Sequence, residues 1–98
     1  MDIVSSLKII DYLILKNISV HEKISRNSLR TNVDFNFKEY AFRRAIRVLH
    51  KEKHLIKQVL QPVILADNSV IIETYYSLTP DGEQALGEIN GLIKAASQ

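Results

Sequence analysis

Hydrophobic and polar residues repeat along this chain with two different periods. Three segments, residues 2–16, 36–54 and 80–96, repeat their apolar residues every three or four positions, which predicts helices. Two shorter runs, Ile56–Leu65 and Val70–Leu78, are rich in Val, Ile, Leu and Tyr, which predicts strands. The pattern therefore predicts an α+β domain in which helices precede and follow a β-hairpin.

The segment 36–54 separates its residues most clearly when it is placed on a helical wheel at about 100° per residue. Its predicted apolar face carries Ala41, Phe42, Ala45, Ile46, Val48 and Leu49. The opposite face carries Asn36, Glu39, Tyr40, Arg43, Arg44, Arg47, His50, Lys51 and His54. We predict that Asn36 caps this helix and that Glu39, three residues later, reaches back to its backbone.

The N-terminal helix, from Asp2 to Lys16, is apolar almost all round, so it exposes more apolar surface than one small core covers. A second chain could supply the cover. A weaker helix is predicted at Ser25–Asn32, with Ser25 as its cap and Ile24 in a short strand.

Turn and cap signals bound the second half of the chain. Residues 66–69, Ala-Asp-Asn-Ser, form a turn signal between the two strands, and Pro62 in the first strand predicts an edge position. Thr79 is a cap for the last helix, which Pro80 begins. Gly87 and Gly91 interrupt that helix, and a close approach of another helix would explain them.

Charge is distributed unevenly over the 98 residues. The net charge of the chain is +2, yet residues 21–57 carry +6, from ten Lys and Arg against four acids, and residues 58–98 carry −4. Positive charge gathered in one third of a small domain favours a polyanionic partner.

Composition excludes several kinds of chemistry. The chain has no Cys, which rules out disulfides, Cys-ligated zinc and a thiol nucleophile. His50 and His54 have zinc-ligand spacing but lack a third ligand nearby in sequence, so we expect no metal and no cofactor. Without a Gly-rich phosphate loop or a serine with an evident base, we expect no enzyme. No apolar run is long enough to cross a membrane, and a cytoplasmic protein is expected.

Two sequence segments resemble a known family of regulators. The run YYSLTPDGEQAL, Tyr75–Leu86, resembles the end of the wing and the start of the last helix in MarR-like and PadR-like regulators, where Leu78, Thr79, Gly82 and Leu86 match the family pattern. FRRAIRVLHKEKHLIKQ, Phe42–Gln58, is similar to a family recognition helix that leads into the first wing strand. The resemblance implies a winged helix-turn-helix domain over residues 1–98, with a three-helix core, a β-hairpin wing and a C-terminal helix. It implies sequence-specific binding of double-stranded DNA as a homodimer.

Candidate DNA contacts follow from the resemblance and the basic face together. Arg43, Arg44 and Arg47 are the expected central contacts. The residues expected near base edges are Asn36, Lys38, Glu39 and Tyr40. Lys51 and His54 are expected along phosphates, and Ser25, Arg26 and Arg30 are expected at the DNA backbone.

The expected dimer interface is built from residues 1–17 and 80–96. Its candidate residues are Leu7, Ile10, Ile14, Leu86, Ile89, Leu92 and Ile93. The wing departs from the family pattern, because no Lys or Arg occurs from Gln58 to Ser77. An alternative function therefore stays open: a winged-helix protein-interaction module, or a plasmid or viral replication or partition factor, that contacts an acidic partner.

Overall fold

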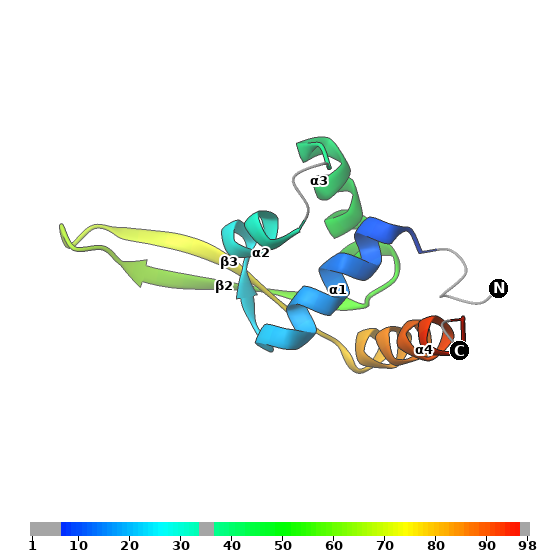
Figure 1. Cartoon of the computed structure of the whole chain (residues 1–98). Helices are drawn as coiled ribbons and strands as arrows, with labels where there is room; N and C mark the ends of the chain where they lie inside the picture. The colour runs from blue at the N-terminus through cyan, green and yellow to red at the C-terminus, as the bar shows by residue number, and fades with distance from the viewer. Residues whose placement is uncertain (1–6, 34–36, 97–98) are drawn as a thin grey trace.

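A computed structural model of the chain describes residues 7–33 and 37–96. In chain order the elements are α1 (Ile9–His21), β1 (Ile24–Ser25), α2 (Arg26–Asn32), α3 (Glu39–Arg47), the π-helical turn η2 (Val48–Glu52), β2 (Ile56–Ile64), β3 (Val70–Leu78) and α4 (Pro80–Ala96). The predicted α+β class is confirmed. The molecule measures 53 × 28 × 23 Å, and its long dimension comes from a hairpin that projects beyond the helices (Figure 1).

The three strands form one antiparallel sheet in the order β1-β3-β2. The predicted hairpin is confirmed, with Ile56 opposite Leu78 at its base and Ile64 opposite Val70 near its tip. Strand β2 lies at an edge of the described sheet, as Pro62 predicted, because a proline lacks the N–H that an inner strand must donate. The short strand predicted at Ile24 is also confirmed and pairs with Tyr76.

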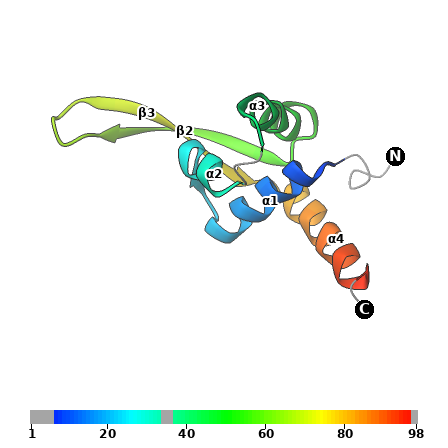
Figure 2. The same ribbon diagram turned by 45° about the horizontal axis from the view of Figure 1, so that its top comes forward.

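The hydrophobic core lies at the base of the hairpin, where α1, α2 and α3 meet β3 (Figures 1 and 2). Its fully buried large side chains are Ile14, Leu15, Ile18, Leu29, Val33, Phe42, Leu49, Leu55, Ile56 and Tyr76. Most of the predicted apolar face of α3 and η2 enters this core, with Ala41 and Val48 only half-buried. No helix in the described ranges has both the length and the apolar character to cross a membrane.

Helix α1 differs from its predicted range. Residues 2–6 lie outside the described residues, Leu7 and Lys8 precede the helix, and the helix continues to His21 rather than ending at Lys16. Buried Ile18 extends the apolar stripe by one more turn, and Glu22, with φ 60°, ends it. Tertiary burial of one isoleucine therefore outweighs the polar and β-branched residues that surround it.

Helix α4 begins as predicted, and its first turn is packed closely. The Thr79 hydroxyl accepts a hydrogen bond from Gly82 N–H at 3.0 Å and donates one to the His54 carbonyl at 2.7 Å. Thr79 N–H donates to the Leu55 carbonyl at 3.1 Å. A Cβ added at Gly82 would overlap that same Leu55 carbonyl, whereas a Cβ at Gly87 or Gly91 meets nothing within 4 Å. The close approach expected at Gly87 and Gly91 is therefore absent in the described chain and occurs at Gly82.

Candidate nucleic-acid interface

Helix α3 lies at the side of the molecule away from α4 (Figure 1). Its buried residues, Phe42, Ala45 and Ile46, follow helical spacing and pack on the core. Tyr40, Arg43, Arg44 and Arg47 are consequently exposed on the other side. We call these four exposed side chains the basic face.

The start of α3 differs from the prediction at its cap. The helix begins at Glu39 with Lys38 as the N-cap residue, and Lys38 provides no side-chain hydrogen bond. Asn36, predicted to be the cap and a base contact, lies outside the described residues. Both carboxylate oxygens of Glu39 bind arginines.

Glu39 joins arginines from two helices. Its carboxylate accepts hydrogen bonds from Arg30 Nε at 2.9 Å and from Arg43 Nε at 3.3 Å, and Arg26 lies 3.9 Å away. The hydrogen bond from Arg30 is the main cause that lowers the pKa of Glu39. The Glu39 carboxylate therefore links Arg30 of α2 to Arg43 of α3.

The two arginines of α2 are held against the same region. Their guanidinium carbons lie 5.6 Å (Arg26) and 5.5 Å (Arg30) from the centre of the Phe42 ring, within cation–π range. Arg30 also donates to the Phe37 carbonyl at 2.7 Å, so it ties α2 to the chain that leads into α3. Ser25 is the confirmed cap of α2, and its hydroxyl accepts from Ser28 N–H at 3.2 Å.

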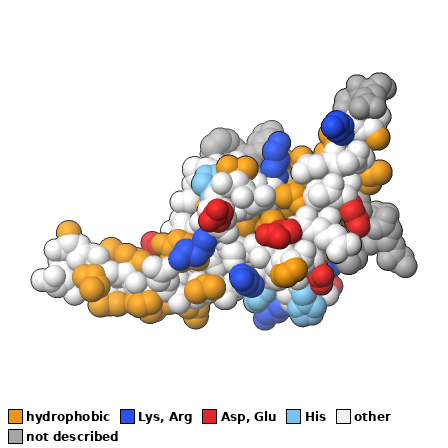
Figure 3. All heavy atoms as spheres, turned by 90° about the horizontal axis from the view of Figure 1, so that it is seen from below, with side chains coloured by type: hydrophobic (Ala, Val, Ile, Leu, Met, Phe, Trp, Pro, Cys, Tyr) orange, Lys and Arg blue, Asp and Glu red, His pale blue; other side chains and the backbone are white. Residues whose placement is uncertain are grey.

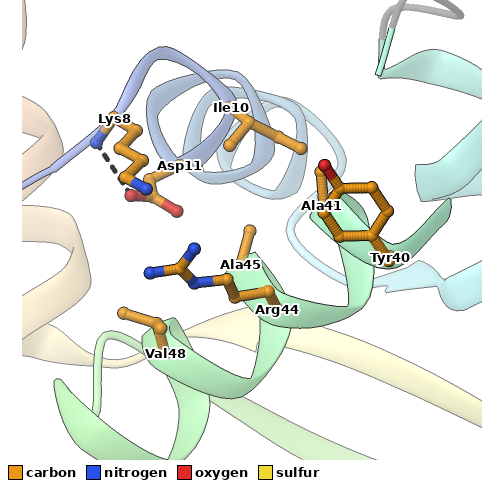
Figure 4. Close-up of a pocket in the computed structure, with 8 residues that line it drawn as sticks. All are labelled: Lys8, Ile10, Asp11, Tyr40, Ala41, Arg44, Ala45 and Val48. Atoms are coloured by element: carbon orange, nitrogen blue, oxygen red, sulfur yellow. Dashed lines mark hydrogen bonds between the residues drawn. The ribbon is translucent and has the colours of Figure 1, made fainter. Parts of the chain in front are cut away.

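The side chains of Arg43 and Arg44 point to opposite sides of α3. Arg43 leans toward α2 through Glu39, whereas Arg44 lines a hollow between α3 and the start of α1 (Figure 4). Arg47, one turn after Arg43, forms no hydrogen bond or ion pair with any described residue. The Arg47 side chain is therefore not fixed by a hydrogen bond or an ion pair to the described part of the chain.

The hollow beside Arg44 contains a buried acid that the sequence analysis did not single out. Asp11, 4% exposed, accepts a hydrogen bond from the Lys8 backbone N–H at 2.8 Å at the start of α1. Burial raises the pKa of Asp11, and the Lys8 backbone hydrogen bond and the nearby cations of Lys8, Lys53 and Arg44 oppose that rise. The available sequence signal was one acid in the middle of the predicted apolar helix 2–16, and Asp11 falls in the first turn because the helix begins at Ile9.

The end of the basic helix is irregular. Lys53 N–H donates to the Val48 carbonyl, five residues earlier, at 2.9 Å, which closes a π-helical turn. Leu55 N–H then donates to the Leu49 carbonyl at 2.8 Å. His54 has φ 54°, the left-handed conformation of a helix-terminating residue. Lys51 and His54 are both exposed, but the first role of His54 is to turn the chain from η2 into β2.

The surface predicted for dimerisation is only partly exposed. Ile10, Ile14 and Leu86 are buried within the chain itself, so they are core residues and need no second subunit to cover them. Leu7 and Ile89 are half-buried and line a shallow apolar hollow between α1 and α4. Leu92 and Ile93 are exposed on α4. These last four residues are the part of the predicted interface that remains available to a partner.

The hairpin carries an exposed Lys57 at its base and no Lys or Arg from Gln58 to Ser77. Between Gln58 and Ser77 its charged residues are acids, including Asp67 at the tip, where the Ser69 hydroxyl and N–H both bind the Asp67 carboxylate. Lys23 reaches the hairpin from β1 and donates to Gln61 at 3.0 Å. Apolar side chains cover most of the rest of the projecting arm, as the side shown in Figure 3 illustrates.

Comparison of the chain with models of known protein families finds no match, and comparison with curated proteins finds none.

Proposed function

We propose that this protein is a winged helix-turn-helix domain that binds double-stranded DNA in a sequence-specific manner, with α3 in the major groove. The observation that carries the proposal is the basic face, on which four exposed side chains, Tyr40, Arg43, Arg44 and Arg47, project from one helix whose other side is anchored in the core. A major groove admits a single α-helix, and arginine pairs with guanine through two hydrogen bonds. Regulation of transcription is the role proposed for this binding.

The arrangement of α2 and α3 supports the proposal. Arg30, Glu39 and Phe42 connect the two helices, so α3 is presented on a rigid support rather than on a loop. Arg26 and Arg30 add positive charge beside the basic face of α3, which suits contact with phosphates. Lys38 and Lys51, both exposed, extend the basic surface toward the two ends of the helix.

A homodimer is proposed as the binding form. Leu7, Ile89, Leu92 and Ile93 would pair across a two-fold axis between α1 and α4 of two copies. One recognition helix contacts few bases and phosphates, and two of them bind half-sites about one helical turn apart. A double variant, Leu92→Asp with Ile93→Asp, is expected to weaken this pairing and DNA affinity together, as measured by sedimentation and by DNA titration.

The alternative function is a protein-interaction module whose basic face binds an acidic partner. The absence of Lys and Arg from Gln58 to Ser77, which includes the hairpin tip, favours it, because DNA-binding wings usually present a cation to the minor groove. Titration of random duplex DNA at two salt concentrations separates the two functions, because a DNA-binding protein binds the duplex and loses that binding as salt rises. Duplex DNA binding falls steeply with salt, with a slope of about −0.9 per phosphate contact.

The decisive experiment selects bound fragments from a random duplex pool and then compares single variants on the selected site. We expect Arg47→Ala and Arg43→Ala to weaken specific binding by about 1–3 kcal/mol each. Lys16→Ala is the matched control, since it removes one exposed positive charge from α1 rather than from α3. Equal affinities for all four proteins, or a pool without enrichment, would contradict the proposed function.

A further inference from the structure

The outer half of the hairpin displays an uninterrupted apolar strip on one face. Directly opposed residues of antiparallel strands share a face, so the pairs Pro62–Ile72 and Ile64–Val70 lie together, and Leu60, two residues before Pro62, lies on the same side. Leu60, Ile64, Val70 and Ile72 are 60–74% exposed, and Pro62 is exposed as well. We call these five residues the wing strip.

The strip continues a surface that the protein covers at its base. Ile56 and Tyr76 occupy the same face of the sheet and are fully buried against the helices. Strand β1 supports β3 only at Tyr75 and Tyr76, so the described sheet has two strands beyond that point. A two-stranded hairpin alone is marginally stable in water. The outer half therefore lacks the apolar cover that its inner half receives from the helices.

The free edge of β2 is a poor site for a further strand. Leu65 N–H donates to the Ser69 carbonyl, and the alternation of an antiparallel ladder then directs the backbone nitrogen at position 62 away from β3. Position 62 is a proline, which has no N–H to offer an added strand. The outer edge of β3, beyond its pairing with β1 at Tyr75 and Tyr76, is also unpaired in the described sheet, but a strand added there would leave the wing strip in water. A partner that covers the strip is therefore expected to pack on the face of the hairpin.

We propose that the wing strip packs face to face on the wing strip of a second copy of this chain. The wing strip contains no charged residue. The strips of two copies therefore do not repel each other. No charge pattern on the strip favours a different protein as the partner. A patch that pairs across a two-fold axis needs only to complement itself, which is the commonest arrangement in homo-oligomers. Two such hairpins form the layered packing of a small β-sandwich.

The size of the strip sets the strength of this pairing. Its exposed side chains leave on the order of 400 Å² of apolar surface in water per copy, comparable with the largest patch on a typical monomer. A standard interface buries about 800 Å² per partner, so wing pairing is weak and depends on concentration.

Wing pairing does not rest on DNA binding and does not compete with the surface on α4. The hairpin and α4 project toward different ends of the molecule (Figures 1 and 2). If both the α1–α4 surface and the wing strip pair with other copies, α1–α4 dimers would be linked into longer assemblies. If only the wing strip pairs, assembly would stop at a dimer.

The test is sedimentation of the full-length chain at about 10–100 μM, the range expected for an interface of this size. We expect the native chain to self-associate and Ile72→Asp to weaken that association at least tenfold. Ala66→Lys is the control, because it adds a charge at the exposed turn beyond the strip. Unchanged circular dichroism and melting temperature establish that each variant is folded.

A pair of opposite charges then identifies the occupant of the strip. Ile72→Lys alone and Ile72→Asp alone are each expected to lose the association. An equimolar mixture is expected to regain it, since the two opposite charges would then share one interface. Association of the native chain that Ile72→Asp leaves unchanged would overturn the proposal, and so would a native chain that stays monomeric. If both single variants dissociate but their mixture does not recover, the strip binds another surface, such as α4 of a second copy. The Leu92→Asp, Ile93→Asp double variant would then lose the same association, and wing-to-wing pairing would be overturned.

Discussion

Gly82→Ala is predicted to destabilise the protein strongly, because Gly82 lies where the hairpin joins α4 and contacts the Leu55 backbone closely. The added Cβ would overlap the carbonyl oxygen of Leu55 and lie 2.9 Å from its carbonyl carbon. Both neighbours are backbone atoms, which no rotamer change can remove. Helix α4 would have to move away from Leu55.

That displacement would cost two hydrogen bonds in addition to the steric strain. Thr79 donates to the Leu55 carbonyl at 3.1 Å and to the His54 carbonyl at 2.7 Å, and both bonds lengthen as α4 moves. Overpacking costs about 1–3 kcal/mol and each lost hydrogen bond about 1 kcal/mol. Alanine recovers about 1 kcal/mol of helix propensity. The expected net loss of unfolding free energy is about 2–4 kcal/mol.

Urea unfolding and thermal melting measure this loss. For a domain of this size about 1 kcal/mol shifts the melting temperature by roughly 4–8 °C, so a fall of roughly 10–25 °C is expected. Gly87→Ala and Gly91→Ala are matched controls in the same helix, because an added Cβ meets nothing within 4 Å at either position. Each control is expected to stabilise the protein by about 0.5–1 kcal/mol. A Gly82→Ala protein as stable as its controls would refute the close approach of Gly82 to Leu55.

Three further substitutions test the local electrostatics and backbone. The pKa of Glu39 is lowered chiefly by the Arg30 hydrogen bond, so its stabilisation is present above the unfolded-state pKa and is lost as pH falls through the folded-state value. Urea titrations between about pH 2 and 6 should therefore show a shallower acid-side loss in Glu39→Gln than in the native chain. Burial raises the pKa of Asp11, so its contribution is complete below the unfolded-state pKa and is lost as pH rises through the folded-state value. Asp11→Asn should remove that loss and be more stable near neutral pH, and a variant with the native pH profile would show that Asp11 is not the titrating group. His54→Gly should raise the unfolding free energy by about 1 kcal/mol, since φ 54° costs glycine little; a melting temperature at or below the native one would contradict this.

Local patterns in the sequence predicted the elements that obey local rules. The hairpin was predicted to within one residue because runs of Val, Ile and Tyr on both sides of a turn-forming run have few other solutions. Ser25 and Thr79 were identified as helix caps because a side-chain hydroxyl near a free N–H depends on neighbours only three residues away. The two faces of α3 followed from its 3.6-residue period, which placed the arginines together on the exposed side.

Other features depend on residues far apart in the chain, and only the tertiary structure decided them. Helix α1 reaches His21 because Ile18 is buried by residues of later elements. Glu39 binds Arg30 because α2 packs beside α3, and without that contact a capping role at its own helix was the better local prediction. Gly82 approaches Leu55, 27 residues earlier, and no periodicity reports the distance between two backbones. The strip on the hairpin carries the same apolar alternation as a core strand, and the pattern alone does not distinguish an exposed strip from a buried one. Its exposure follows from the reach of the hairpin beyond the helices, since burial depends on which surfaces are near and not on the strand's own residues.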